Sequence, residues 1–453
     1  MLEGRAVDGR PASAEMRTKG SGGHADRCER MCGDAFPFTK SERMELGMSE
    51  GRGTDVTDIF DYRAERDGKS PFHPPVKYQM LRDESPVSQV NMWDGSKAWF
   101  ITRRDDVRAA LADERLSADN RRPGFPLLSR GSETLTDNNP TFARMDPPEH
   151  TRQRAMVNAD FTQRSAARWR PQIQQIVDRL VDEMLAKSPP ADLVGELAEP
   201  LAAQVMCLVL DIPYEEDFFQ RVASTFADHY VGQDKLDVAS DELTSFITGI
   251  LEAKAANPGR DLLSRLITQQ EANGELTRDD IIGMTRVMIV AGYEPAVHGV
   301  SLGLAALFFN PDQLALLRDN PSLIAGGLGE LLRYSTNFHT GLPRVAIGDT
   351  EIGGQQIKTG EAVLVYLPTA NFDPQWFDDP DSLDLRRSNS GNVSFGHGLH
   401  RCLGQHVVRI QMETVLETLL RRIPDMRLAV DLDQIRFARE AAVYGMYELP
   451  VTW

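Results

Sequence analysis

The segment Ile281–Phe309 constrains the fold of this chain most, because it is almost wholly apolar. Helical periodicity extends it back to Thr277, and at about 1.5 Å per residue a helix from Thr277 to Phe309 would span roughly 50 Å. Such a helix must lie at the centre of a large domain or cross a membrane. Arg286, Glu294 and Pro295 interrupt the segment and are poorly placed in hydrocarbon. We therefore predict a buried central helix in a mainly α-helical domain.

Length and composition indicate one large domain with an N-terminal extension. The 453 residues are 41% hydrophobic and 26% charged, which is ordinary for a soluble protein. No linker rich in Pro, Gly and Ser, and no internal repeat, divides residues 70–453. Residues 1–52 differ, because they are rich in Gly, Arg, Ser and Glu and contain few aliphatic side chains. We expect residues 1–52 to be disordered and residues 53–453 to form the single domain.

Charge and cysteine content exclude several classes of protein. The formal net charge of −17 argues against a nucleic-acid partner. The chain has 4 cysteines: Cys28, Cys32, Cys207 and Cys402. Their contexts imply no disulfide framework, so a reducing cytoplasm fits. The opening residues Met1–Arg5 do not begin a signal peptide. We expect a cytoplasmic monomer without a membrane or nucleic-acid partner.

Helical patterns dominate after Asp146, and a small β-rich region accompanies them. Asp146–Glu149 is a strong helix start, with an acidic N-cap, Pro at the first helical position and a Glu three residues on. Further helices are predicted at Arg170–Lys187, Glu196–Leu210, Ser240–Ala256, Arg260–Asn273, Pro311–Asp319 and Pro321–Tyr334. Strands are predicted at Val87–Val90 and Ala98–Thr102, joined by a turn at Asp94-Gly95, and within Arg344–Val365.

Cys402 lies at the end of a glycine-containing run, Phe395–Gly404, and an amphipathic helical pattern follows it as far as Leu420. This order places the sulfur at a helix N-terminus beside Arg401, with backbone N–H groups directed at it. These factors favour a thiolate over a thiol. A thiolate is a good axial ligand for heme iron and promotes O–O cleavage. The alternative is a buried, inert cysteine.

Two further pairs have helical spacing. Glu330 and Arg333 are three residues apart and can face each other on a helix. His150 and Arg154 lie one helical turn apart, so they share a face and can both donate hydrogen bonds to a carboxylate. Each pair alone is weak evidence, because surface ion pairs of this kind are common.

Together these motifs resemble the cytochrome P-450 family over residues 70–453. The run Phe395–Gly404 matches the heme-binding pattern Phe-x-x-Gly-x-x-x-Cys-x-Gly, and Glu330–Arg333 matches the Glu-x-x-Arg motif. Arg387 would complete a buried ion network with that motif. The resemblance implies the cytochrome P-450 fold, a heme b (iron protoporphyrin IX) cofactor and a substrate pocket covered by the irregular loop 119–143.

The resemblance also assigns roles around the heme. Cys402 would ligate the iron, and Phe395 would pack near its sulfur. The propionates would be held by His150, Arg154, Arg344 and His400. Burying two propionates without partners would be costly, so several convergent donors are expected.

The centre of the long helix departs from the family pattern Ala-Gly-x-(Asp/Glu)-Thr-(Thr/Ser). Ala291, Gly292 and Glu294 match it, but Pro295 stands at the threonine position, whose hydroxyl helps to relay protons in the family. Pro295 also lacks an N–H, so the Ala291 carbonyl loses its helical partner, and the helix should kink or widen there. Glu294 remains as the candidate proton-relay acid. The alternative is a purely structural kink.

The resemblance implies a soluble, actinobacterial-type heme-thiolate monooxygenase. It would hydroxylate or epoxidise a mid-sized organic molecule of bacterial secondary metabolism, with dioxygen and with electrons from ferredoxin and ferredoxin reductase. A basic dock for ferredoxin could use Arg152, Arg164, Arg168, Arg401 and Arg409.

Two alternatives stay open. Pro86–Val90 and Gly124–Pro126 also resemble fungal nitric-oxide reductases, whose basic NADH channel could use Arg121, Arg122 and Arg130. NADH-dependent nitric-oxide reduction or peroxide-driven oxidation on the same fold is therefore the first alternative. A non-catalytic heme binder is the second.

Overall fold

The computed structural model describes residues 60–61, 64, 66, 70–128, 141–227, 233–387, 391–439, 441 and 443–453. All of them belong to one compact unit, Asp55–Trp453. The expected extension, residues 1–52, lies outside the described residues, as does the part of the expected substrate loop at 129–140.

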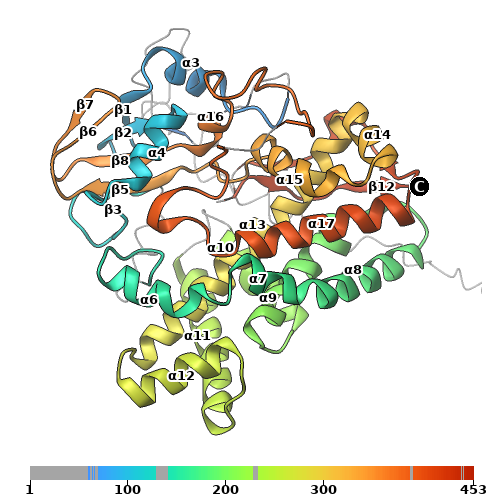
Figure 1. Ribbon diagram of the computed structural model, residues 1–453, viewed down its shortest axis with the longest axis horizontal. Coiled ribbons are helices and arrows are strands. Elements are labelled where there is room, and N and C mark those ends of the chain that lie inside the picture. Colours follow the sequence, from blue (N-terminus) through green and yellow to red (C-terminus); the bar gives the residue numbers. More distant parts are fainter. Residues whose placement is uncertain are drawn as a thin grey trace, which may run out of the picture. The chain divides into compact units, whose positions relative to one another are not determined.

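Helices make up most of this unit, as predicted (Figure 1). They are α3 (Val76–Glu84), α4 (Arg104–Ala112), α6 (Glu149–Asn158), α7 (Gln163–Ala166), α8 (Arg170–Leu185), α9 (Glu199–Leu210), α10 (Glu216–Ala227), α11 (Gln233–Ala256), α12 (Leu262–Asn273), α13 (Arg278–Phe309), α14 (Pro311–Asp319), α15 (Leu323–Tyr334), α16 (Leu367–Asn371) and α17 (Gln405–Arg422). The predicted helix Glu196–Leu210 is in fact two pieces, because a π-helical turn, η2 (Val194–Ala198), leads directly into α9.

The start of α6 differs from the prediction. The helix begins at Glu149, and Pro148 occupies its N-cap position. Asp146 caps nothing, because its carboxylate instead accepts hydrogen bonds from the Ser117 hydroxyl at 2.6 Å and the Ala118 N–H at 3.1 Å. The acidic side chain therefore ties β3 to the segment before α6.

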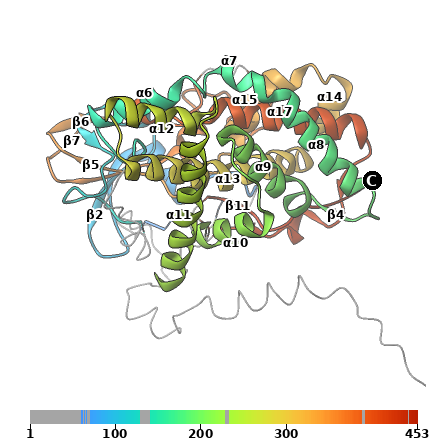
Figure 2. The ribbon, with the colours of Figure 1, turned by 90° about the horizontal axis from the view of Figure 1, so that it is seen from below.

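The long apolar segment forms α13, which packs against α9, α11, α12, α15 and α17. In the view from below, it crosses the middle of the helices (Figure 2). A capping box starts it, with Thr277 and Asp280 each accepting from the other's backbone N–H. Among the described residues, α13 is the one helix with the length and apolarity of a membrane span. Its packing within the unit confirms the predicted central core helix.

Helix α13 continues through Pro295 as an unbroken α-helix, so it does not widen there, and the predicted kink stays a prediction. The carbonyl oxygen of Pro295 accepts a hydrogen bond from Asn337 Nδ2 at 2.9 Å. Asn337 follows α15, and its own carbonyl accepts the Tyr444 N–H at 2.8 Å. Neighbouring segments thus brace the turn in which the proline removes a helical hydrogen bond.

The main sheet and the β6–β7 pair lie at one side of the helices, whereas β12 lies at the opposite side near the C-terminus (Figure 1). The main sheet has the order β1-β2-β8-β5-β3, from Val87–Asn91, Lys97–Ile101, Ala362–Val365, Leu342–Ala346 and Leu116–Ser117. The predicted hairpin is confirmed, with Val87 opposite Ile101, and β2 runs parallel to β8. The smaller sheets are β6 (Thr350–Ile352) with β7 (Gln355–Ile357), β10 (Phe437–Ala438) with β11 (Gly445–Met446), and β4 (Ala191–Asp192) and β9 (Arg427–Leu428) on either side of β12 (Pro450–Thr452).

The predicted ion network is confirmed, and the Glu330–Arg333 pair at its centre is fully buried. Arg333 Nε lies 2.7 Å from Glu330 Oε2, and both side chains are 0% exposed. Arg387 Nε approaches the other oxygen of Glu330 at 3.0 Å. Arg333 also donates to the backbone carbonyls of Asn371, Pro380 and Ser382. The network therefore fastens the irregular segment after α16 to α15.

We expect Glu330→Ala to lower the free energy of unfolding by about 3–5 kcal/mol, because it leaves a buried guanidinium without its counter-charge. Glu183→Ala is the matched control, since it breaks an Arg–Glu pair whose side chains are 48% and 55% exposed and should cost less than about 1 kcal/mol. Chemical unfolding measures both variants. Equal losses would contradict a structural role for the buried network.

Candidate functional site

The cysteine loop is closed by its own backbone. The Cys402 N–H donates to the Phe395 carbonyl at 2.9 Å, and a short 3-10 turn, η3 (Gly398–His400), precedes the cysteine. The sulfur accepts hydrogen bonds from the backbone N–H groups of Gly404 and Gln405, where α17 begins. The predicted position of the sulfur at a helix N-terminus is therefore confirmed.

The predicted preference for a thiolate does not hold for the polypeptide alone. Burial raises the pKa of the Cys402 thiol and outweighs the lowering by the Gly404 N–H and by the charges of Arg154 and Arg401. The free-energy cost of removing a thiolate from water exceeds the stabilisation that these few donors and charges provide. Coordination to a metal ion deprotonates a thiol outright, so the loop is suited to a metal-bound sulfur rather than a free thiolate.

The structure brings the four predicted carboxylate donors together beside this loop. The rings of His150 and His400 have centroids 4.5 Å apart. Arg154 Nη2 donates to the carbonyl of Arg401, next to the cysteine, at 2.6 Å. Arg344 is buried in β5, and its pKa is lowered to about 10, first by burial and then by a neighbouring arginine.

That neighbouring arginine, Arg144, was missed by the sequence analysis. It lies in the irregular stretch before α6, and it lowers the pKa of both Arg344 and His400. Its guanidinium is 5.8 Å from the Phe125 ring centroid. No periodic pattern contains this position, so only the tertiary structure brings it to the other donors.

This donor set has polar atoms that the described residues leave without partners. Neither ring nitrogen of His150 has a hydrogen-bond partner there, and the same is true of Nδ1 of His400. Asp146, an acid whose charge raises the pKa of His150, is already paired with Arg122 at 3.0 Å. Buried donors without acceptors are costly, so the cluster fits the two carboxylates of a heme.

Phe395 contributes through its backbone and its ring. Its carbonyl accepts the Cys402 N–H, and its ring lies 5.4 Å from the Arg409 guanidinium carbon. The side chain packs at the border of the main core. The backbone contact places Phe395 beside the backbone of Cys402, and the packing of its ring near the sulfur stays a prediction.

The distal candidates lie together on α13. Ala291 is exposed, whereas Gly292 and Pro295 are half-buried, and a β-carbon on Gly292 would lie 3.5 Å from Met206 of α9. Burial raises the pKa of Glu294 to about 7, although the backbone N–H of Val443 lowers it. Oε1 of Glu294 is buried and has no hydrogen-bond partner in the described part of the chain.

The arginines of the expected NADH channel are already engaged. Arg121 pairs with Asp119 at 2.9 Å, and Arg122 pairs with Asp146 at 3.0 Å. Arg130 lies outside the described residues. The two arginines that can be placed therefore present little uncompensated positive charge.

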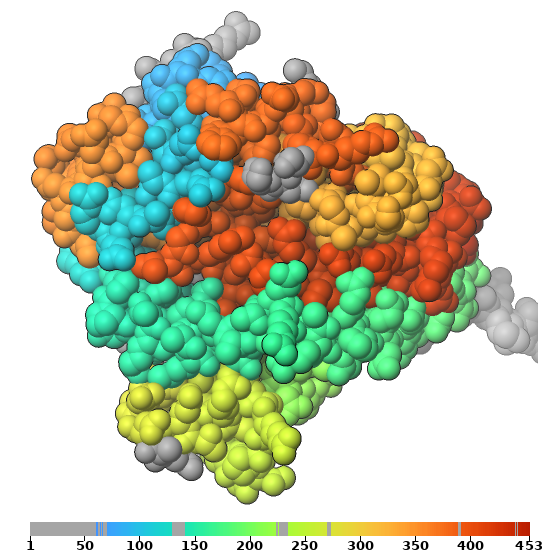
Figure 3. Space-filling view, in the orientation of Figure 1, coloured from blue at the N-terminus to red at the C-terminus, as the bar shows by residue number. Residues whose placement is uncertain are grey.

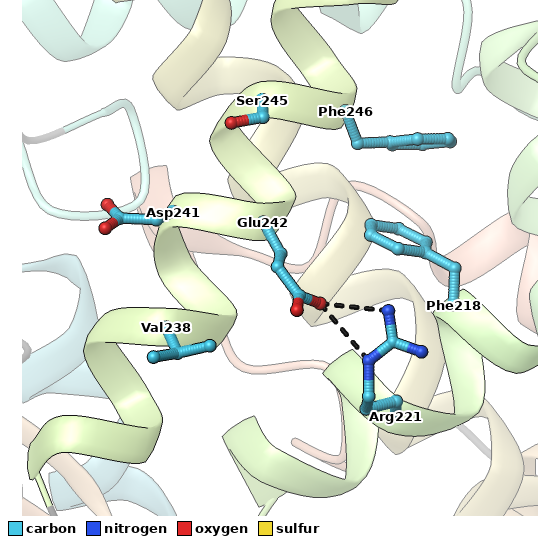
Figure 4. A pocket seen from close by; sticks show the side chains of 7 residues that line it. All are labelled: Phe218, Arg221, Val238, Asp241, Glu242, Ser245 and Phe246. Atoms are coloured by element: carbon cyan, nitrogen blue, oxygen red, sulfur yellow. Dashed lines mark hydrogen bonds and ion pairs between the residues drawn. The ribbon is translucent and has the colours of Figure 1, made fainter.

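A separate surface hollow of about 500 Å³ lies between α10 and α11. Phe218 and Phe246 line it, with ring centroids 4.4 Å apart. Beside them Arg221 pairs with Glu242 at 3.0 Å (Figure 4). None of the predicted heme or distal residues lines this hollow.

Comparison with known proteins finds chains that are similar to this one over most of its length. A family model described as Cytochrome P450 matches residues 217–423. "Cytochrome P450-SU2" of Streptomyces griseolus is 41% identical over 90% of this chain and 100% of that protein. "Vitamin D3 dihydroxylase" of Streptomyces griseolus is 36% identical over 84% of this chain and 95% of that protein. The crystal structure of GfsF, 40% identical, superposes with a TM-score of 0.80 over 86% of this chain and 99% of that one.

Two glycines of the cysteine loop allow a matched test of its geometry. Gly398 has φ +69°, and a β-carbon there would lie 2.3 Å from the Leu111 carbonyl oxygen, whereas Gly396 has φ +70° and open space around it. Changing either residue to Ala costs about 1–2 kcal/mol, because a β-carbon is strained in the left-handed backbone conformation. We expect Gly398→Ala to lower the thermal midpoint further than Gly396→Ala. Equal midpoints would show that α4 does not constrain the loop.

Proposed function

Because the chain belongs to the cytochrome P450 family of heme b monooxygenases, we propose that it oxidises a mid-sized organic molecule of bacterial secondary metabolism by hydroxylation or epoxidation. The observation that carries the proposal is the Cys402 sulfur, lined by the N–H groups of Gly404 and Gln405 next to a cluster of unpartnered carboxylate donors. A similar protein named as a dihydroxylase supports hydroxylation as the first choice.

Each residue of the proximal side has a proposed task. Cys402 ligates the iron, and Phe395 closes the loop over the sulfur. The propionates are held by His150, Arg154, Arg344 and His400. Arg154 ties this cluster to the cysteine loop through its bond to the Arg401 carbonyl. When bound, heme b would supply the reductive activation of dioxygen, and a thiolate ligand would favour cleavage of the O–O bond.

Glu294 is the proposed distal acid, with Ala291, Gly292 and Pro295 shaping the helix around it. A carboxyl group whose pKa is about 7 can both give and accept a proton near neutral pH. Pro295 has no hydroxyl, so protons cannot reach dioxygen through the side chain at position 295, where the family has a threonine.

Electrons are proposed to come from ferredoxin and ferredoxin reductase. In the space-filling view, the cysteine loop and α17 reach the surface between α4 and the α6–α7 segment (Figure 3). Exposed arginines of this region are Arg152, Arg164, Arg168 and Arg401. Complementary charge of this kind mainly raises the encounter rate with an acidic partner. A cytoplasmic, monomeric enzyme is part of the same proposal.

The alternatives receive less support. NADH-dependent nitric-oxide reduction needs a basic channel, and Arg121 and Arg122 are paired with acids. Consumption of NADH by nitric oxide without a partner protein would establish it. Peroxide-driven oxidation would need no electron donor, and a non-catalytic heme binder would show no turnover with any donor.

We expect Cys402→Ser to abolish the red-shifted absorption band of the reduced carbon-monoxide complex, because serine provides no thiolate. Cys207→Ser is the control, since Cys207 is also a free cysteine among the described residues, and its buried sulfur donates to the Pro213 carbonyl at 3.5 Å. That variant should retain the band. A red-shifted band in Cys402→Ser would exclude Cys402 as the ligand.

We expect Pro295→Thr to raise the fraction of NADH that is converted into oxidised product and to lower peroxide release, because it adds a hydroxyl near Glu294. Pro295→Ala separates the effect of the hydroxyl from the effect of the restored helical hydrogen bond. Both variants restore the backbone N–H, but Ala adds no hydroxyl. If both variants change the coupling equally, the helical hydrogen bond and not the hydroxyl is responsible.

A further inference from the structure

The central helix α13 keeps one face accessible, although it packs against five other helices. Ala291 is exposed, and Glu294, Pro295 and His298 are half-buried. Positions three and four residues apart lie on the same face of a helix, so these four side chains form one stripe along α13. The positions that flank the stripe are buried: Tyr293, Ala296, Val297 and Val300. A small molecule that reaches the proposed distal acid, Glu294, along this face therefore also meets His298.

His298 packs against a glycine of the β10–β11 hairpin. A β-carbon on Gly445 would lie 2.0 Å from Nδ1, 2.2 Å from Cγ and 2.4 Å from Cε1 of the His298 ring. The ring therefore occupies the place where any other side chain at position 445 would begin. The backbone of Gly445 does not have the left-handed conformation that favours glycine. The absence of a side chain at this position thus serves the close approach of the His298 ring.

Asn337 holds the hairpin and the central helix in this arrangement. Its Nδ2 donates to the Pro295 carbonyl at 2.9 Å, and its own carbonyl accepts the Tyr444 N–H at 2.8 Å. Pro295 lies within one turn of His298, and Tyr444 directly precedes Gly445. The bridge through Asn337 therefore fixes the glycine opposite the ring.

The surroundings of the His298 ring decide which of its nitrogens carries the hydrogen. Burial lowers the pKa of His298 to about 4, so the ring is neutral near pH 7 and has one N–H group. Nδ1 is buried and has no hydrogen-bond partner among the described residues, and a buried N–H group without an acceptor is rare in proteins. The hydrogen therefore lies on Nε2. This nitrogen is not buried in the same way and forms no hydrogen bond within the described part of the chain.

We propose that the Nε2–H group of His298 donates a hydrogen bond to an oxygen atom of the substrate, and that Gly445 is the residue that allows the ring this position. The inference rests on the proposed monooxygenase function and narrows its substrate to a molecule that carries an accepting carbonyl, ether or hydroxyl oxygen. His298 is then a specificity-determining residue. A hydrocarbon of the same shape would leave the N–H group without a partner, and such an unpaired group disfavours binding.

The test measures binding to the holoenzyme by equilibrium dialysis. The probes are cyclic ketones from cyclohexanone to cyclododecanone, each compared with the cycloalkane of the same ring size, and the readout is the ratio of the two dissociation constants. We expect His298→Phe to reduce the preference for the ketone roughly tenfold, the upper range for one neutral hydrogen bond. Binding of the cycloalkane should change little, because phenylalanine keeps a ring of similar size.

Two further variants separate the hydrogen bond from packing. His298→Gln keeps a side-chain N–H group and should retain most of the preference for the ketone. Gly445→Ala keeps the histidine, but its β-carbon would lie 2.0 Å from Nδ1. It should displace the ring and lose the preference as His298→Phe does.

The outcomes divide as follows between the inference and the proposed function. An unchanged ratio in His298→Phe would overturn the inference and leave His298 as a ring that only fills space against Gly445. Wild-type protein that binds no ketone of the series would overturn it as well. If His298→Phe does not fold, loss of the preference in Gly445→Ala and its retention in His298→Gln decide the question. Wild-type protein that shows the preference but performs no dioxygen-dependent oxidation would instead overturn the proposed function alone.

Discussion

The buried ion pair of Glu330 and Arg333 is the interaction on which the position of the site depends. Arg333 donates to the carbonyl of Asn371 at 2.8 Å, and the Asn371 side chain accepts the Val393 N–H at 2.8 Å and donates to Ser394 at 3.0 Å. These bonds connect α15, through Asn371, to the segment that leads into the cysteine loop. Because the pair is fully desolvated, each partner requires the other, so losing either residue would also weaken this connection.

The site itself concentrates positive charge and hydrogen-bond donors that the protein does not neutralise. Arg144, Arg154 and Arg344 surround two histidines with unpartnered ring nitrogens. Burial also raises the pKa of the Cys402 thiol. Both features are unfavourable for a polypeptide alone, and both are relieved by one group that carries a metal cation and two carboxylates. The apparent defects of the site are thus complementary to heme.

The central helix joins this site to the opposite face of the domain. Its apolar composition places it in the core, and the same burial shifts the pKa of Glu294 to about 7. Pro295 interrupts the hydrogen bonding at this point, and Asn337 braces the turn from outside the helix.

The sequence by itself determined the class of fold, the central helix, the ion network and the cysteine loop, because each depends on local spacing. Glu330 and Arg333 are one turn apart, and Cys402 directly precedes the helix that lines its sulfur. Only the tertiary structure decided the rest: that Asp146 ties down β3 instead of capping α6, that Arg144 joins the donors, and that burial outweighs the factors favouring a thiolate. Each of these depends on desolvation or on contacts between distant segments, which no periodicity encodes.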